Sequence, residues 1–392
     1  ILRCLVGSEM CIRDRVNAVR EPHPHLLEVK KIYQNIKSTL VDKKNLTIRV
    51  KNWFDFSDLN EYLLHWSVTG DDGTIVAEGS KEVTCAPHAV VDITLGAVKL
   101  PKTLREAYLN LSWTRVKATP LVTSDWEVAY DQFVLPVSKN SWSGKPAKAG
   151  NTTFVVDEAT GALKSLCLDG EELLASPITL SLFRPATDND NRDQNGAKLW
   201  RQAGLDHLTQ KVVSLKEGKN KTTVKADILN AEGKKIGNAE FIYALNRDGS
   251  MKVQTTFEPD TSLVKSMARL GITFEMKDTY ENVTYLGRGE HETYTDRNQS
   301  GKIGVYKTTP ERMFHYYVVP QSTGNRTDVR WLQLTDEHGK GCWIEANSFF
   351  QFSTFPFSDV ILEKARHINE LKRDGKITCL LYTSDAADDL IG

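Results

Sequence analysis

The sequence has no excess of charge of one sign, because 50 lysine and arginine residues nearly balance 51 aspartate and glutamate residues. A balanced chain offers no whole-chain electrostatic footprint for nucleic acid or for an anionic membrane surface, and we predict neither as a partner. Its uninterrupted apolar runs are only a few residues long, far short of the roughly 20 residues that cross a bilayer. With 392 residues, 40% of them hydrophobic, the composition is typical of a globular protein with two or three domains.

The sequence also lacks the short motifs of several chemistries. It contains no CxxC pair, no HxxxH or HExxH zinc motif, no GxSxG nucleophile elbow and no GxxxxGK[ST] phosphate loop. The stretch LGRGEH at 286–291 is superficially similar to a phosphate loop, but no helical pattern follows it, which favours a tight turn between strands. Away from the chain ends only Cys85, Cys167 and Cys342 remain, and their apolar surroundings favour core thiols. We predict no cofactor in this segment.

Both ends of the chain differ in character from the interior. Residues 1–15, ILRCLVGSEMCIRDR, and residues 379–392, CLLYTSDAADDLIG, resemble translated sequencing-adapter DNA. We expect both to be artefacts and exclude them from the fold argument, as one would an expression scar. The first is a poor signal peptide, because Glu9 and Asp14 interrupt it and no apolar core follows. We therefore expect an internal piece of a longer protein.

Hydrophobic periodicity predicts an almost entirely β protein. Residues 26–36 carry apolar side chains at helical spacing after the prolines of EPHPH, which predicts one short helix. Farther along, alternation such as Leu46, Ile48 and Val50 indicates half-buried strands, and six or seven of them between residues 45 and 137 predict a β-sandwich.

A second all-β region follows a linker. Residues 138–151, SKNSWSGKPAKAGN, have linker composition. Strand patterns such as TTVKADIL, AEFIYAL and MKVQTTF then succeed one another with short polar breaks, which predicts a large antiparallel sheet system. A helical pattern returns only around residues 361–371.

The most polar stretch of the chain is FRPATDNDNRDQNG, residues 183–196. Eight side chains in a row, 188–195, are charged or carry an amide. An EF-hand is excluded, because counting from Asp188 puts Arg192 at position 5 and Leu199 at position 12. Asx-turns explain such a loop without any ligand. Sugar recognition is the sharper hypothesis, because hydroxyl-rich ligands need dense donors and acceptors, and Trp200 nearby offers a ring on which a pyranose can stack.

Catalytic groups cannot be selected from the sequence alone. Glycoside cleavage needs two carboxyl groups roughly 5 to 9.5 Å apart, and nothing in the sequence selects such a pair. A sugar epimerase would need a histidine and a carboxylate on one face of a sheet, for which His291 with Glu290 or Glu292 is the only local candidate. A pair of carbohydrate-binding modules without an enzymatic partner is a further alternative.

Several long motifs resemble one enzyme family in the correct order. FRPATDNDNRDQNGAKLWRQAGLD (183–206), VTYLGRGEHETYTDR (283–297) and YYVVPQSTGNRTDVRW (316–331) look like stretches of the last domain of large bacterial β-galactosidases, glycoside hydrolase family 2. Upstream, REPHPHLLEVKKIYQNI (20–36) is similar to the peptide that leaves the catalytic barrel, and LLHWSV (63–68) to a strand of the immunoglobulin-like domain. The resemblance covers about residues 16–378.

The resemblance implies an all-β architecture in which an immunoglobulin-like β-sandwich precedes a truncated galactose-mutarotase-like β-supersandwich, with minor helix near the N-terminus. The implied parts are the tail of the catalytic barrel (16–36), the immunoglobulin-like domain (37–137), the linker (138–151) and the supersandwich (152–378). Because the family's last strands would follow residue 378, we expect an open sheet edge there.

The resemblance also implies a role for the polar loop. Thr187, Asp188, Asn189 and Asp190, supported by Arg184, would border a galactoside pocket. Both catalytic glutamates, the Mg²⁺ and Na⁺ ligands of the barrel and the N-terminal galactose-binding domain would precede residue 16, and a tryptophan-bearing stretch would follow residue 378. We therefore predict a non-catalytic piece of a homo-oligomeric, retaining β-galactosidase that is inactive alone. The sequence leaves open whether the compartment is the bacterial cytoplasm or the periplasm.

Overall fold

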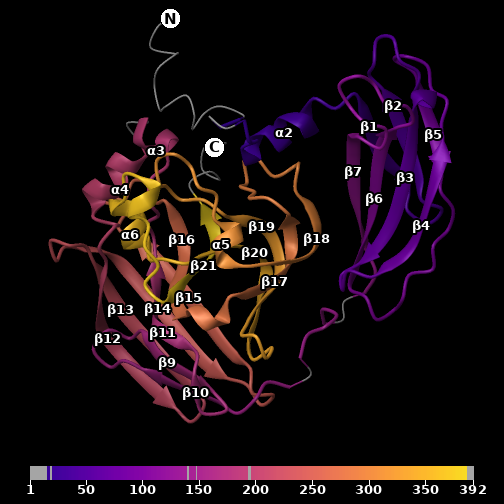
Figure 1. The fold of residues 1–392 in the computed structure, drawn as a ribbon. Helices are drawn as coiled ribbons and strands as arrows, with labels where there is room; N and C mark the ends of the chain where they lie inside the picture. The colour runs from indigo at the N-terminus through magenta and orange to yellow at the C-terminus, as the bar shows by residue number, and fades with distance from the viewer. Residues whose placement is uncertain (1–15, 18–19, 139–140, 147, 193–195, 386–392) are drawn as a thin grey trace, which may run out of the picture.

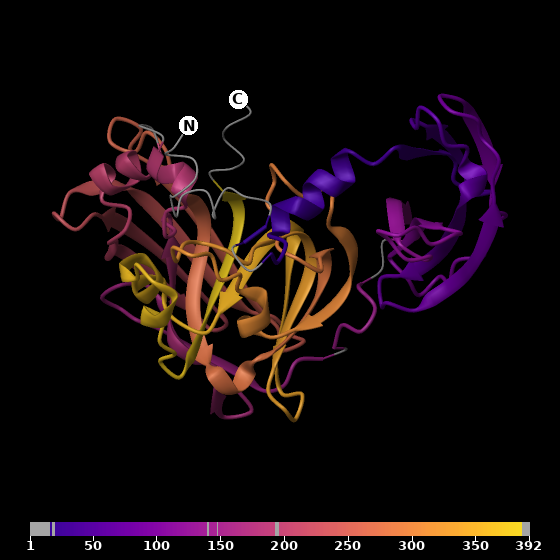
Figure 2. The same cartoon turned by 45° about the horizontal axis from the view of Figure 1, so that its top comes forward.

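The computed structural model describes residues 16–17, 20–138, 141–146, 148–192 and 196–385. Figures 1 and 2 show two β-rich bodies that are connected by a linker, and a helix lies between them on the other side. The predicted all-β class, made of antiparallel sheets with little helix, is confirmed. None of the described helices is long and apolar enough to cross a membrane.

The first body is a two-sheet sandwich of seven strands. They are β1 (Ile36–Asp42), β2 (Thr47–Asn52), β3 (Tyr62–Gly70), β4 (Ile75–Glu82), β5 (Val90–Thr94), β6 (Glu106–Arg115) and β7 (Glu127–Pro136). One sheet has the order β1-β2-β5 and the other β4-β3-β6-β7. The alternation in the sequence places Ile48 and Val50 inside the sandwich, where they pack with Trp113 in one hydrophobic core. All three side chains are fully shielded from solvent. The predicted sandwich is confirmed.

The second body contains the remaining strands. They are β8 (Thr152–Val156), β9 (Leu163–Leu168), β10 (Glu171–Glu172), β11 (Leu174–Ser181), β12 (Thr209–Gly218), β13 (Lys221–Leu229), β14 (Lys235–Leu245), β15 (Met251–Pro259), β16 (Arg269–Lys277), β17 (Asn282–Gly289), β18 (Lys302–Thr308), β19 (Arg326–Thr335), β20 (Gly341–Phe355) and β21 (Lys376–Asp385). A ten-stranded sheet has the order β10-β9-β11-β16-β21-β20-β19-β17-β18, with β8 beside β9. A four-stranded sheet, β12-β13-β14-β15, shares its hydrophobic core.

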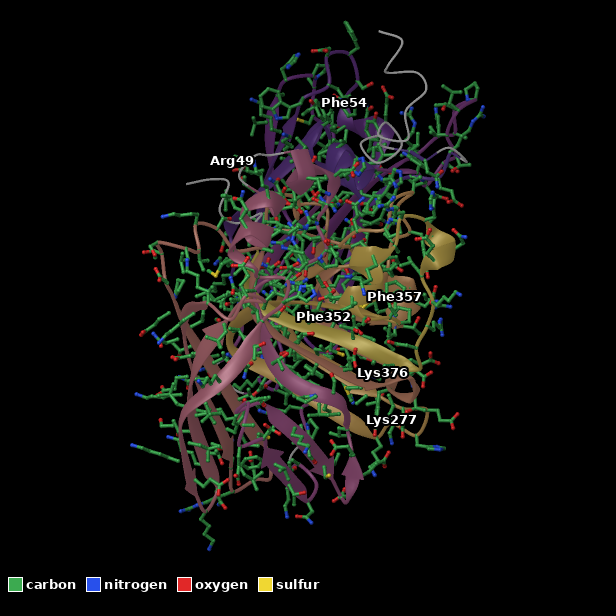
Figure 3. The ribbon with its side chains drawn as sticks, turned by 90° about the vertical axis from the view of Figure 1, so that its left-hand side faces the viewer. Arg49, Phe54, Lys277, Phe352, Phe357 and Lys376 are labelled. Atoms are coloured by element: carbon green, nitrogen blue, oxygen red, sulfur yellow. The ribbon has the colours of Figure 1, made fainter. Side chains whose placement is uncertain are left out.

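Period-two burial explains how the two sheets meet. In β13, Thr222, Val224, Ala226 and Ile228 are buried, while the residues between them are half-buried or exposed. The side chains of Val224, Ala226 and Ile228 pack in one core with residues of the large sheet such as Phe274. Lys277, the last residue of β16, pairs with Lys376, the first residue of β21, and both mark one end of the strands of the large sheet (Figure 3).

Strand β21 corrects the expectation for the C-terminal residues. Residues 379–385, which the sequence analysis set apart, continue a strand that pairs with β16 on one side and β20 on the other. Cys379, Leu380 and Tyr382 are buried, because an interior strand of this sheet is covered on both faces. Within the described residues the expected open edge is therefore not at β21. Residues 1–15 and 386–392 lie outside the described part of the chain.

The helices are short and lie beside the sheets. They are α2 (Pro24–Ile32), α3 (Asp188–Arg192), α4 (Ala197–Ala203), α5 (Pro310–Met313) and α6 (Asp359–Lys364). The helix expected at 26–36 is thus shifted, because proline suits the first turn of α2, and Ile36 already begins β1. The helical pattern expected around 361–371 is divided into α6 and a 3-10 turn at Ile368–Glu370. Of the predicted core thiols, Cys85 is buried, whereas Cys167 and Cys342 are only half-buried.

The first body and α2 both contact the β18 side of the large sheet (Figures 1 and 2). Gln132 of β7 exchanges two hydrogen bonds of 2.7 Å with the backbone of Ile303. The carboxylate of Glu28 in α2 accepts the backbone N–H groups of Gln299 and Ser300 at 3.1 and 2.9 Å. These contacts orient the two bodies and bring α2 near the end of the sheet that carries the polar loop.

Candidate functional site

The polar loop follows β11 at the end of the large sheet opposite Lys277. Ser181, the last residue of β11, pairs with Gly271 near the start of β16. The chain then turns into the short helix α3. Thr187 and Asp190 form a capping box, because the Asp190 carboxylate accepts the Thr187 backbone N–H at 2.7 Å and Thr187 Oγ1 accepts the Asp190 N–H at 3.4 Å. The sequence TDND therefore folds locally into the first turn of a helix.

Arg184 binds this turn through an ion pair with Asp190. Its Nη1 lies 2.5 Å from Asp190 Oδ2, its Nη2 lies 3.3 Å from Oδ1, and the two side chains are only 7% and 13% exposed. Asp190 Oδ2 also accepts the Thr187 hydroxyl at 2.8 Å. Such two-pronged, charge-assisted pairs fix geometry strongly. The Asp190 carboxylate is thus occupied within the loop.

The five predicted rim residues lie together, but they point in different directions. Arg184, Thr187 and Asp190 bind one another, Asp188 is half-buried, and Asn189 is exposed. Asn189 is therefore the residue of this group that is most accessible to a ligand, through its side-chain amide. Whether the group borders a substrate stays a prediction.

The role predicted for Trp200 is wrong. Its ring in α4 is only 1% exposed, its Nε1 donates to Ser266 Oγ at 3.2 Å, and Phe183 packs edge-on against it. The Arg184 guanidinium lies 5.4 Å from the ring centroid. Trp200 thus supports Arg184 from inside, and no face of it is left for a pyranose.

Two hollows in the described surface lie away from the polar loop. One is lined by residues that include Glu311 and Arg373, and the other by residues that include Asn238 and Glu258. Neither includes a residue of 183–192. The loop is therefore a wall of neither hollow.

A turn at 320–324 packs beside the loop. The Asp188 N–H donates to Gln321 Oε1 at 3.4 Å, and the Ser322 N–H donates to the Pro185 carbonyl at 3.3 Å. The two partners in the first contact are 133 residues apart in sequence. Sequence periodicity carries no signal for this pairing, although both stretches belong to motifs that the sequence analysis singled out.

Glu292, one of the carboxylates considered for an epimerase, lies buried under this turn. It accepts Arg297 Nη2 at 2.5 Å and Tyr317 OH at 2.8 Å on Oε1, and Thr323 Oγ1 at 2.5 Å and Gly324 N at 2.7 Å on Oε2. Burial opposes its charge, but the Arg297 charge and these hydrogen bonds hold the pKa of Glu292 well below its usual range. A carboxylate has about four acceptor positions, and all are used. Glu292 is therefore unsuited to proton transfer.

His291, the histidine of that candidate pair, is held beside Ser300. Its Nε2 lies 2.8 Å from Ser300 Oγ, and burial, together with the positive charges of Arg326 and Arg297, lowers the pKa of His291 to about 4. The imidazole is consequently neutral at pH 7. The exposed Glu290 and the neighbouring Glu292 do not form a catalytic pair with it, since one faces solvent and the other is fully hydrogen-bonded.

Acid should destabilise the fold through His291. Between pH 6.5 and about 4 the unfolded state binds a proton that the folded state does not, so the free energy of unfolding falls as pH falls through this window. The full difference between the pKa of His291 in the unfolded state and in the folded state corresponds to about 3 kcal/mol of unfolding free energy. Urea unfolding at pH 7, 5.5 and 4.5 measures it, and His291→Asn should flatten the dependence. An equally steep dependence in His291→Asn would contradict the assignment.

The family models decide where this chain belongs. A model described as "Beta galactosidase small chain" matches residues 148–386, which is more than half of the chain. The chain belongs to the β-galactosidase small chain family. A second model, "Beta-galactosidase, domain 4", matches residues 48–136, so the two matches follow the two bodies of the fold. The resemblance drawn from the sequence is confirmed at the level of the family.

The β-galactosidases that this chain is similar to are longer than the chain itself. The β-galactosidases of Priestia megaterium and Aeromonas hydrophila are each 29% identical to it, over 91% and 94% of this chain but only 36% and 38% of their own length. The β-galactosidase of Actinobacillus pleuropneumoniae is 25% identical over 96% of this chain and 38% of its own length. The chain thus spans little more than a third of these relatives.

Proposed function

We propose that this chain supplies the scaffold and one rim of the active site of a β-galactosidase, while a catalytic barrel outside this chain carries the bond-breaking carboxylates. The complete enzyme would hydrolyse terminal β-D-galactosides with retention of configuration. Family membership supports this proposal, as does the length of the curated β-galactosidases that lies beyond the match. A galactoside and the remaining domains are then the partners of this chain, in a homo-oligomeric parent.

The observation that carries the proposal is that the Asp190 carboxylate is hydrogen-bonded within the polar loop while the Asn189 amide is exposed. A retaining glycosidase needs two carboxyl groups about 5–5.5 Å apart, one to attack and one to donate a proton. Two of the carboxylates at the loop are already committed, Asp190 to Arg184 and Thr187, and Glu292 to its four donors. The exposed Asn189 amide can both donate to and accept from a sugar hydroxyl. This loop is therefore suited to recognising a saccharide rather than cleaving it.

The implied metal ions concern the barrel. Among the described residues no group of three or more His, Cys, Asp or Glu side chains is placed to hold a metal ion. Because this part of the chain offers no ligand set for the Mg²⁺ and Na⁺ that the family resemblance implies, we assign no step of the reaction to either ion.

The proposal predicts a binding defect for Asn189→Ala. In the complete parent enzyme the variant should raise KM for o-nitrophenyl β-galactoside roughly threefold to tenfold, the effect of one lost hydrogen bond, with a smaller change in kcat. Steady-state kinetics measure the split. Asn220→Ala, which removes another exposed amide at the β12–β13 turn, is the matched control and should leave both constants unchanged.

The purified chain provides a second test. Produced in a strain without endogenous galactosidase, it should show no turnover of the same substrate. Turnover by the chain alone, or identical kinetics of the Asn189 variant and the parent enzyme, would refute the proposal. Tight binding of galactose to the chain in a calorimeter would instead favour a carbohydrate-binding module.

A further inference from the structure

Two of the sequence motifs meet at the Glu292 carboxylate, and a turn of one of them contacts the third motif, the polar loop. Glu292 belongs to the 283–297 motif, its donors Tyr317, Thr323 and Gly324 belong to the 316–331 motif, and the turn containing Thr323 contacts the polar loop. The proposed function accounts only for the loop. The other two motifs surround a carboxylate that is too well bound to perform chemistry, which points to a positioning role.

One oxygen of Glu292 serves the polar loop. Oε2 accepts Thr323 Oγ1 and the Gly324 N–H, which ties down the turn whose Gln321 and Ser322 contact the loop backbone. Gly324 has φ +78°, and a Cβ there would lie 2.7 Å from the Met313 carbonyl oxygen. The turn can therefore approach Glu292 only with glycine at this position.

The other oxygen serves the N-terminal segment. Oε1 accepts Tyr317 OH, and the Tyr317 ring stacks on His23 with 5.3 Å between centroids. His23 Nδ1 also lies 2.8 Å from Nε2 of His315, whose ring packs edge-on against Tyr317 at 4.5 Å. His23 immediately precedes α2, so this branch ends where that helix begins.

We propose that Glu292 is a positioning residue that sets the polar loop and the start of α2 relative to each other, through Thr323 and Gly324 on one branch and Tyr317 on the other. Its significance for a galactoside site rests on the proposed function, because α2 would then join the rim to the catalytic barrel. The geometric claim itself concerns only this chain.

Two variants that each delete one hydrogen bond separate the branches. Thr323→Val should speed amide exchange about tenfold or more at Thr187, Asp188 and Asn191, while leaving α2 unchanged, because one charge-assisted hydrogen bond is lost. Tyr317→Phe keeps the ring but removes the hydroxyl. It should speed exchange at Leu26, whose N–H donates to the His23 carbonyl at 2.9 Å, without affecting the loop. Hydrogen exchange followed by NMR or mass spectrometry measures both.

Glu292→Gln should increase amide exchange in both segments together. Glu290→Gln is the matched control, because Glu290 is only two residues away in sequence but is exposed. Amides of β13 and β14 serve as the reference for global opening, and their rates should not change in the two single-bond variants. If Thr323→Val and Tyr317→Phe each affect both segments, or neither, the proposal is overturned. The exchange experiment needs no galactosidase activity, so a failure of the proposed function leaves its outcome readable.

Discussion

Replacing Trp200 by alanine should lower the free energy of unfolding of the second body by about 3–5 kcal/mol. The ring is 1% exposed, packs against Phe183, and carries the Arg184 guanidinium at 5.4 Å. Its removal leaves a cavity and takes away the support under the ion pair with Asp190. The polar loop should lose order in the same variant. Urea denaturation measures the loss of stability.

Trp53→Ala provides the control for this prediction. Trp53 is 46% exposed in the first body, and its removal should change stability by less than about 1 kcal/mol. The structure gives Trp200 an internal role, and the expected signature is lost stability. A Trp200→Ala chain as stable as the parent, with only ligand binding reduced, would show that the ring is accessible after all.

Replacing Arg330 by methionine should cost about 3–5 kcal/mol and weaken the contact between the two bodies. Its side chain is 2% exposed, and Nε donates to Glu106 Oε2 of the first body at 3.0 Å. The guanidinium also lies 3.9 Å from the Phe349 ring centroid. Without Arg330, the partly buried Glu106 carboxylate keeps the hydrogen bond from the Tyr108 hydroxyl, at 2.8 Å. An uncompensated buried charge is the main source of the loss.

The exposed pair Arg49–Asp92 supplies a matched comparison. Its two hydrogen bonds are 2.8 and 2.9 Å long, but its side chains are 54% and 46% exposed, so Arg49→Met should cost less than about 1 kcal/mol. In the double variant Arg330→Met with Glu106→Gln, part of the lost stability should return. Calorimetry of all three chains measures the difference, and equal losses for Arg330→Met and Arg49→Met would rule out a special role for burial.

The case of β21 shows one limit of sequence reasoning. Residues 379–392 resemble adapter-derived peptide and are not expected to take part in the fold, yet residues 379–385 complete a strand between β16 and β20. Strand formation depends on local β propensity and on a place in a sheet, whatever the origin of the residues. The alternation read from the sequence was sufficient for the strands themselves, as Val224, Ala226 and Ile228 illustrate.

The polar loop shows a second limit. The composition of the loop indicates hydrogen bonding, but the partners of each side chain are set by the tertiary structure. Asp190 is predicted to border a substrate, and only the structure shows that it binds Arg184 and Thr187, while Trp200 lies beneath them. A charged or amide side chain looks the same in sequence whether its partner is sugar, water or a neighbouring arginine.

The β class and the family follow from the amino-acid sequence alone, because burial on one face imposes a period of two and because long motifs are specific in order. The tertiary structure was needed to show that Glu292 binds the 316–331 motif and that Asn189 is the exposed residue among the five predicted rim residues. Contacts such as Asp188 with Gln321 depend on the order of strands in the sheet, which local periodicity does not encode.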